Sequence, residues 1–496
     1  MSFFSTRGGA CVTASQAILY SLAPDGGLYV PVMFPPVSHE KLASLVNMSY
    51  IQRASTILRT YLEDFSIPEI DAALTAAYGG GKFDDPAIAP LKKLDDHTHV
   101  LELFHGPTLA FKDMALQLLP HLTTLSARKN GEEREISILV ATSGDTGKAA
   151  LEGFKDVPGT SCTVFYPLDG VSDVQKLQMV TTGGENTHVI AVEGNFDDAQ
   201  TGVKKLLGDA VFAEKANAAG KVLSSANSIN FGRLVPQVVY YFSAYADLVR
   251  SHEIMVGEPV NFVVPTGNFG NILAAYYARS MGLPVNRLIC ASNRNNVLTD
   301  FFEKGIYSTH RTFFKTTSPS MDILISSNLE RLLFEAADRD GELIRVWMKQ
   351  LQECGSYSVG DQRRDWLNTI FYAGCANDLE TAWEIRDRFH QDHYLMDTHT
   401  AVASRVLREY REKTGDDTCT VLVSTASPYK FSEAVLTAVA GQEAAEGLDA
   451  FACAAKLEEL SGRAVPKQVS ALRTLPVRHR AVTAPENMAQ AVMETW

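Results

Sequence analysis

The segment LELFHGPTLAFKDMALQLL, residues 101–119, places one lysine among apolar neighbours. Lys112 directly follows Phe111, just after a Gly-Pro turn, and a run of Met and Leu residues comes next. A lysine in an apolar setting loses hydration, so its pKa falls and its neutral amine becomes a nucleophile toward aldehydes. Lys112 is therefore a candidate Schiff-base lysine. The alternative is a lysine on a helix edge, with an apolar stem and an ammonium group in water.

A glycine- and asparagine-rich loop, PTGNFGN at 265–271, follows an apolar run and leads into a helical pattern. Gly267 and Gly270 allow the backbone to turn its N–H groups toward a ligand, and the N-terminus of a helix adds partial positive charge. The loop therefore suits a phosphate group, although an ordinary turn between strand and helix would also explain it. It is not the dinucleotide fingerprint GxGxxG.

The segment ATSGDTGKAA at 141–150 resembles a P-loop only superficially. Thr142 stands where the first glycine is required, and Ala149 stands where Ser or Thr would hold magnesium. Ser143, Asp145 and Thr146 remain as groups that could hold a carboxylate or a phosphate at the start of a helix. Simple N-capping by these residues is the alternative.

Two further polar segments are candidates for ligand binding. In SSANSINFGRLVPQ, residues 224–237, Asn227 and Ser228 precede Arg233, whose planar guanidinium suits an oxyanion. In STASPYKF, residues 424–431, Thr425 ends an apolar strand pattern. The alternatives are a polar loop with a surface arginine and a turn before a helix. Together, the segments offer a lysine, a phosphate loop and a partner for a ring nitrogen, which an enzyme using pyridoxal phosphate (PLP) needs.

The elements that must position these residues are strands alternating with helices. From residue 135 the pattern predicts parallel sheets with helices on both faces, whereas residues 1 to about 95 look like a separate unit and 320–412 is mostly helical. Ligands of open α/β sheets bind beyond the carboxyl ends of the strands. The loops at 142–147, 265–271 and 424–428 are therefore expected to form the site.

The composition excludes some classes of protein. The 496 residues are 46% hydrophobic and carry a net charge of −13, which argues against nucleic acid or an anionic membrane as the main partner. Seven scattered cysteines without a CxxC pair make a disulfide framework or a metal site unexpected and indicate a reduced, cytoplasmic protein. We expect neither a signal peptide nor a membrane span.

These motifs, with LAPDGGLYVP at 22–31, together resemble the threonine synthase family of the longer bacterial and fungal type. The resemblance runs almost end to end. It implies an α/β fold of the fold type II PLP enzymes, similar to the tryptophan synthase β chain, with two open α/β domains and an N-terminal domain. The implied boundaries are 1–95 for the N-terminal domain, 96–115 with 226–496 for the large PLP-binding domain (helical insertion at about 320–412), and 116–225 for the small domain.

The resemblance also implies roles for individual residues. Lys112 would be the catalytic Schiff-base lysine, and Thr425 would face the pyridine nitrogen. The cofactor phosphate would be held by Gly267, Asn268, Phe269, Gly270 and Asn271. The substrate-binding residues would be Ser143, Asp145, Thr146, Asn227, Ser228 and Arg233. The chain departs from the family in two places, since shorter relatives have Asn at the position of Asp145 and many relatives have His at that of Ser427.

The implied reaction converts O-phospho-L-homoserine and water into L-threonine and phosphate. Two alternatives remain open at this point: a phospho-lyase that yields 2-oxobutyrate, ammonia and phosphate, and a catalytically inactive relative that only binds. The expected partner is a small-molecule substrate, with neither nucleic acid nor membrane, and the chain is expected to be a monomer or a homodimer.

Overall fold

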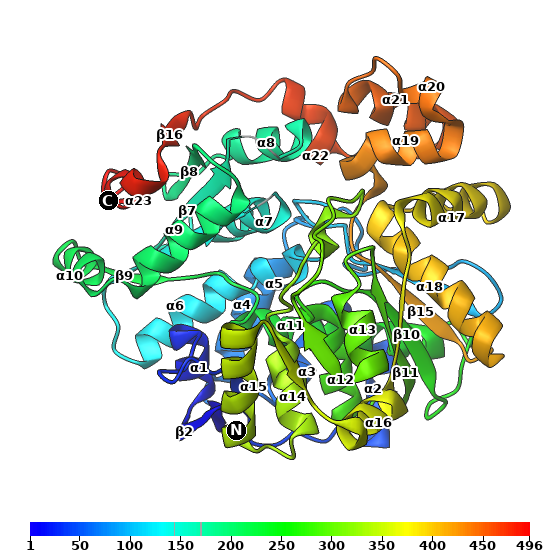
Figure 1. Cartoon of the computed structure of the whole chain (residues 1–496), viewed down its shortest axis with the longest axis horizontal. Coiled ribbons are helices and arrows are strands. Elements are labelled where there is room, and N and C mark those ends of the chain that lie inside the picture. The colour runs from blue at the N-terminus through cyan, green and yellow to red at the C-terminus, as the bar shows by residue number, and fades with distance from the viewer. Residues whose placement is uncertain (143, 169–170) are drawn as a thin grey trace.

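The computed structural model describes residues 1–142, 144–168 and 171–496, which form two open sheets with helices on both faces (Figure 1). The larger sheet has the strand order β14-β11-β10-β15-β5-β4, and only the β4–β5 pair is antiparallel. Its strands are β14 (Phe371–Cys375), β11 (Val285–Ser292), β10 (Val260–Pro265), β15 (Thr420–Ser424), β5 (Thr98–Glu102) and β4 (Leu91–Lys93).

The smaller sheet is parallel throughout, in the order β16-β8-β7-β6-β9. Its strands are β16 (Ala481–Thr483), β8 (Thr187–Val192), β7 (Thr160–Pro167), β6 (Glu135–Ala141) and β9 (Lys221–Ser224). One face packs against α9 (Phe196–Gly208) and the other against α7 (Asp145–Phe154). Because both faces are covered, β7 is buried along its whole length, as expected for a parallel sheet.

The remaining helices complete the layers around the two sheets. Those before or beside the smaller sheet are α6 (Leu119–Lys129), α8 (Asp173–Val180) and α10 (Ala210–Ala218). The helices of the larger sheet and its insertion are α12 (Gly270–Ser280), α13 (Val297–Lys304), α14 (Leu329–Ala336), α15 (Gly341–Cys354), α16 (Asp361–Ile370), α17 (Asp378–Gln391) and α18 (Thr398–Thr414). The insertion also contains a pair of antiparallel strands, β12 (Ile306–Ser308) and β13 (Ser356–Ser358). The C-terminal helices are α19 (Ser432–Ala440), α20 (Gln442–Ala445), α21 (Ala450–Ser461), α22 (Lys467–Ser470) and α23 (Met488–Met493).

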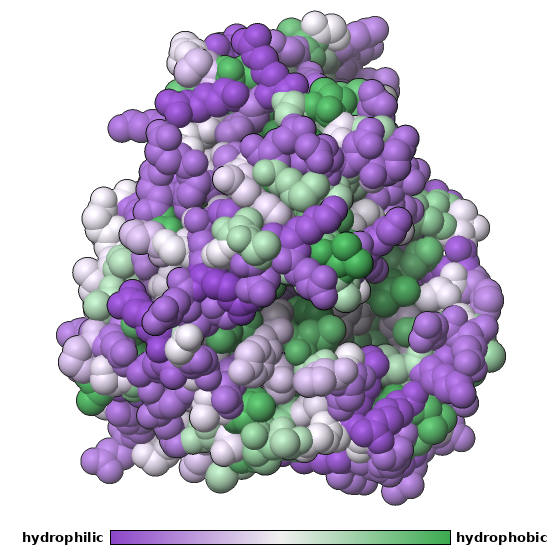
Figure 2. All heavy atoms as spheres, turned by 90° about the vertical axis from the view of Figure 1, so that its left-hand side faces the viewer, coloured by the Kyte–Doolittle hydropathy of each residue, from purple (hydrophilic) through white to green (hydrophobic). Residues whose placement is uncertain are grey.

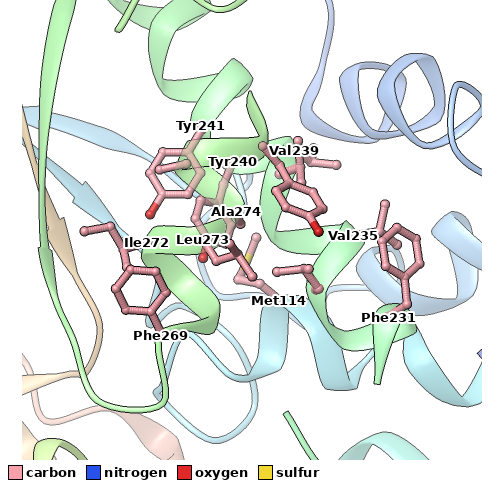
Figure 3. Packing of buried hydrophobic residues seen from close by; sticks show 14 of the residues in the cluster. Met114, Phe231, Val235, Val239, Tyr240, Tyr241, Phe269, Ile272, Leu273 and Ala274 are labelled. Atoms are coloured by element: carbon pink, nitrogen blue, oxygen red, sulfur yellow. The ribbon is translucent and has the colours of Figure 1, made fainter. Parts of the chain in front are cut away.

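Helix α11 (Phe231–Arg250) is the central helix of the core. Its residues 231–248 are all buried, so the helix is surrounded by protein rather than amphipathic. It packs against α12 and against α5 (Asp113–Leu116), the short helix that follows Lys112. Figure 3 shows Met114 of α5 among Val235 and Val239 of α11 and Leu273 of α12. The short helix that follows Lys112 therefore packs against the buried helix α11.

The N-terminal segment packs onto α11. It consists of a three-stranded antiparallel sheet and four helices: β1 (Phe3–Ser5), β2 (Gly8–Val12), β3 (Tyr29–Pro31), α1 (Ala14–Tyr20), α2 (His39–Ser44), α3 (Tyr50–Leu58) and α4 (Ile67–Tyr78). Arg53 of α3 is only 2% exposed and forms an ion pair of 2.7 Å with Asp247 of α11. The same guanidinium donates to the carbonyls of Leu45, Val46 and Ser243.

The structure differs from the sequence-based boundaries at three strands. β4 lies in the larger sheet, although residues 1–95 were expected to form a separate unit. β16 lies in the smaller sheet, although 226–496 was assigned to the large domain, and β14 lies inside the stretch expected to be helical. Each is a short edge strand. β14 and β16 pair with β11 and β8, which lie far away in the chain, so no local pattern could reveal them, whereas β4 joins the larger sheet through its neighbour in the chain, β5.

We predict that Arg53→Ala lowers the free energy of unfolding by about 3 kcal/mol, because it removes the buried cation beside Asp247 and leaves only the exposed Arg250 paired with it among the described residues. The control is Arg59→Ala, which removes the more exposed ion pair with Asp71 and is expected to cost about 1 kcal/mol or less. Urea denaturation of both variants measures the difference. Equal effects would contradict the importance of the buried pair.

Candidate active site

Lys112 lies at the end of a tight turn that is attached to the loop after β15. Leu109 adopts a left-handed backbone conformation with φ +59°, which reverses the chain before the lysine. The N–H of Phe111 donates to the carbonyl of Thr425 at 2.8 Å, and the N–H of Ser427 donates to the carbonyl of Leu109 at 3.1 Å. These two hydrogen bonds place the Lys112 turn beside Thr425.

Asp113 holds the turn from inside. Its carboxylate accepts the backbone N–H of Thr108 at 2.8 Å and the Thr108 hydroxyl at 2.7 Å. A side chain at Gly106 would come within 2.5 Å of this carboxylate, so only glycine fits there. Burial raises the pKa of Asp113 to about 6, against the effect of these hydrogen bonds and of Lys430. Asp113 thus stabilises the turn that precedes Lys112.

Burial also lowers the pKa of the Lys112 amine, to about 8. Asp145 opposes this shift with its negative charge, whereas the positive charges of Lys430 and Arg233 add to it. The distance from Lys112 Nζ to Asp145 Oδ2 is 3.8 Å. An amine with such a pKa is neutral in a sizeable fraction of molecules near neutral pH, which the attack on an aldehyde requires.

Asp145, at the start of α7, reaches across from the smaller sheet. Its Oδ1 lies 2.6 Å from Lys430 Nζ and accepts a hydrogen bond from Gln175 Nε2 at 3.0 Å. Burial favours protonation of this carboxyl, but Lys430 and Lys112 outweigh it and hold its pKa well below the usual range. The sequence analysis missed Lys430 and Gln175. The signal for Lys430 was available, since it is a lone cation in a buried segment, as Lys112 is.

The glycine-rich loop leads into α12 as predicted. Phe269, at the N-cap position, has φ +65° and makes no capping hydrogen bond with its side chain, so the first turn of α12 is open to an external acceptor. A side chain at Gly267 would come within 2.7 Å of the Ser320 carbonyl. Asn271 Oδ1 accepts the hydroxyls of Tyr240 and Tyr241, both at 2.6 Å, which fixes the orientation of its amide. Its Nδ2 is buried without a hydrogen-bond partner among the described residues.

Arg233 lies in the first turn of α11 and is only 5% exposed. Its Nη1 donates to the Ala226 carbonyl at 2.8 Å, but its Nε is buried without a partner in the part of the chain that the structure describes. No carboxylate within residues 1–142, 144–168 and 171–496 forms an ion pair with it. Burial lowers the pKa of Arg233 to about 10. A buried guanidinium in this state is suited to an anionic ligand.

Asn328 connects the Arg233 region to the glycine-rich loop, and the sequence analysis did not identify it. Its Nδ2 donates to the Asn268 carbonyl at 3.0 Å and lies 3.4 Å from the Ser228 hydroxyl. Asn227 is exposed at the rim, whereas Ser228 is half-buried. A cavity of 610 Å³ is lined by Lys204, Ser326 and Ser327 among others, and none of the predicted site residues that the structure describes belongs to its lining. Figure 2 shows that the face containing the smaller sheet is hollowed near its middle.

Two other predicted site residues have simpler surroundings. Thr425 is buried directly after β15, and Thr146 is half-buried in the first turn of α7. Ser143 lies outside the described residues. Asp145 after β6 and Thr425 after β15 lie beside the Lys112 segment. The loop after β10 is linked through Asn328 to Ser228, in the segment before Arg233. This arrangement can bind an aldehyde and two anionic groups.

His105 holds the same turn from its outer side. Its ring nitrogens lie 2.5 Å from Asp84 Oδ1 and 3.0 Å from Glu102 Oε2. Burial disfavours the charged ring, but the two carboxylates dominate and raise the pKa of His105 to about 9. No role was predicted for this histidine from the sequence, because Asp84 is brought to it by the fold, although Glu102 lies only three residues before it.

The chain matches three family models. They are described as "Threonine synthase N terminus" over residues 2–78, "Pyridoxal-phosphate dependent enzyme" over 88–353 and "Threonine synthase, C-terminal" over 400–494. A threonine synthase of Pseudomonas aeruginosa is 42% identical, with 89% of this chain and 91% of that protein covered. A human protein named threonine synthase-like 1 is 41% identical over 86% of this chain, which spans only 58% of that protein's length.

Solved structures show the same similarity. A PLP-bound threonine synthase from Brucella melitensis superimposes with a TM-score of 0.89 at 37% identity, covering 100% of this chain and 99% of that one. The yeast threonine synthase gives a TM-score of 0.88 at 32% identity, covering 100% and 98%. The fold is therefore that of the fold type II PLP enzymes, as expected.

We predict that the stabilisation by His105 depends on pH. Because its folded-state pKa of about 9 lies above the ordinary value of 6.5, its contribution is complete below about pH 6.5 and is lost as the pH rises through about 9. The urea midpoint of His105→Gln should therefore fall below that of the wild type at low pH and approach it at high pH. The exposed His97→Gln is the control. A constant difference across this range would argue against a charged His105.

Proposed function

Because the chain belongs to the threonine synthase family of enzymes, we propose that it converts O-phospho-L-homoserine and water into L-threonine and phosphate. The observation that carries this proposal is Arg233, a buried guanidinium without a carboxylate partner among the described residues, whose charge also acts on the Lys112 amine. A phosphate ester that has its amine end near Lys112 and its phosphate near Arg233 would match both groups.

PLP is the cofactor of this enzyme. When bound, it supplies an aldehyde for the substrate amine and a ring that accepts the electron pair left when the Cα proton is removed. The unpartnered Asn271 Nδ2 and the uncapped start of α12 fit the cofactor phosphate. We propose that the loop from Gly267 to Asn271 holds this phosphate, that Thr425 faces the ring nitrogen and that Lys112 binds the aldehyde carbon.

Lys112 would then act as the base. Once the substrate amine has replaced it, its free amine would remove the proton from the substrate Cα and then one from Cβ, and phosphate would leave from Cγ. Two protons would return, one to Cγ and one to Cα, and water would divide into the hydroxyl that Cβ gains and a proton that the departed phosphate takes up. A pKa of about 8 suits both directions of transfer, because the amine can accept a proton and return it near neutral pH.

Arg233, with Ser228 and Asn227 at the rim, would bind the substrate phosphate. The guanidinium would stabilise the charge that develops on this group as the bond to Cγ breaks. Thr146 and the first N–H groups of α7, with Ser143, would bind the substrate carboxylate. The ion pair of Asp145 with Lys430 supports a place for Asp145 beside the cofactor ring rather than in direct contact with a second carboxylate.

We further propose that the enzyme works in the reducing cytoplasm. All seven of its cysteines are free thiols, and three of them are buried. No helix among the described residues is long and apolar enough to cross a membrane.

The proposed reaction predicts equal amounts of phosphate and threonine from O-phospho-L-homoserine, with neither product formed by Lys112→Ala. The wild type loaded with PLP should show the absorption band of lysine-bound PLP, and the variant should not. Release of 2-oxobutyrate and ammonia in place of threonine would identify a phospho-lyase. A protein that binds no PLP would contradict the proposed function as a whole.

Replacement of Arg233 by Met should lower kcat/KM for O-phospho-L-homoserine by about 10²–10³-fold, because a charge-assisted contact to the departing phosphate is lost. In the PLP-loaded protein, where the loop from Gly267 to Asn271 is occupied by the cofactor phosphate, inorganic phosphate should protect the wild type against thermal unfolding, but not this variant. Arg250→Met, at the exposed end of the same helix, is the control and should keep both properties. If phosphate protected the wild type and Arg233→Met equally, Arg233 would not belong to the anion site.

A further inference from the structure

Lys430 lies beside the site without a role in the reaction proposed above. It belongs to the 3₁₀ helix η3 (Pro428–Phe431), which follows Thr425, and its side chain is 0% exposed. Its ammonium group lies 2.6 Å from Asp145 Oδ1 and donates to the carbonyl of Thr108 at 2.9 Å. A charged amine buried this deeply requires an explanation, since its desolvation is costly.

We propose that Lys430 is a positioning residue that keeps Asp145 charged and in place beside Lys112 while the Lys112 amine changes its own charge. The inference deepens the proposed function, on which it rests. Its structural basis is that one ammonium group links three segments: the turn that carries Lys112, the start of α7 at the smaller sheet, and the segment after β15.

The role of Lys430 follows from the charge balance around Asp145. A buried carboxylate needs a cation, and within the described part of the chain two lysines form ion pairs with this one. If Lys112 were the sole partner of Asp145, every loss of its proton would leave Asp145 buried and unpaired. The ion pair would therefore disfavour the neutral form of the Lys112 amine, which the reaction uses. Lys430 remains paired with Asp145 when Lys112 becomes neutral, so deprotonation of Lys112 no longer leaves a buried carboxylate without a cation.

The same geometry determines the direction of the effect on Lys112. The charged groups that face its amine are Asp145 of α7, Arg233 of α11, Lys430 of η3 and the neighbouring Asp113. Removal of Lys430 takes away a repelling cation and leaves Asp145 free to attract the Lys112 ammonium. Both changes favour the protonated form of Lys112, so its pKa must rise.

The test is a titration of Lys112 in the apoprotein, which requires no turnover. Reductive methylation with ¹³C-formaldehyde labels the lysine, its NMR signal is assigned by its absence in Lys112→Arg, and its midpoint is followed with pH. In Lys430→Met, we expect the midpoint to rise by about one pH unit or more. A midpoint equal to that of the wild type would overturn the proposal, whatever the product assay shows.

Two further variants separate positioning from general stability. Lys148→Met removes another buried lysine of α7, which pairs with Glu152 and Thr182, and should lower the thermal midpoint without moving the titration of Lys112. The double variant Asp145→Asn/Lys430→Met removes both charges and should fold even if Lys430→Met does not, with Lys112 within about half a pH unit of the wild type. A double variant that does not fold, or an effect of Lys148→Met on Lys112, would overturn the inference.

Discussion

The removal of most water from around the Lys112 side chain, which is 13% exposed, is the constraint on which the site depends. Desolvation alone disfavours the ammonium form, and the neighbouring charges then adjust the balance. Burial to this degree needs protein on most sides of the amine. The chain provides it by closing the turn before Lys112 onto the segment after β15 and by bringing α7 across from the smaller sheet. The two open sheets are thus not independent supports, because the reactive amine lies where they meet.

Helix α11 provides the rigid reference for this junction. It is buried over its first 18 residues, carries Arg233 in its first turn, and supplies the two tyrosines that orient Asn271 at the start of α12. The two regions proposed to bind anions are therefore held by one pair of packed helices. Strand-end loops are ordinarily mobile parts of a protein, but here their polar groups are fixed by packed side chains rather than by the loops themselves.

The polar groups left without partners are as informative as the hydrogen bonds. Among the described residues, Asn271 Nδ2 and Arg233 Nε are buried and unsatisfied, and both belong to segments that the sequence analysis assigned to phosphate binding. A folded protein keeps such groups at a cost in stability, which binding of a ligand offsets. Asp145 shows the opposite situation, since its charge is already matched by lysines within the chain.

The sequence by itself determined the class of the protein, because its motifs are local: Lys112 in its apolar turn, the glycine-rich loop at 265–271 and Arg233 each follow from residue types within a short segment. The parallel sheets could likewise be predicted from the alternation of strands and helices, since burial on both faces leaves a continuous apolar run. Only the tertiary structure placed β14 and β16 and revealed Lys430, Asn328 and the contact of Asp84 with His105. The physical reason is that edge-strand pairing and the charge balance of buried groups depend on partners far apart in the chain, which no local pattern records.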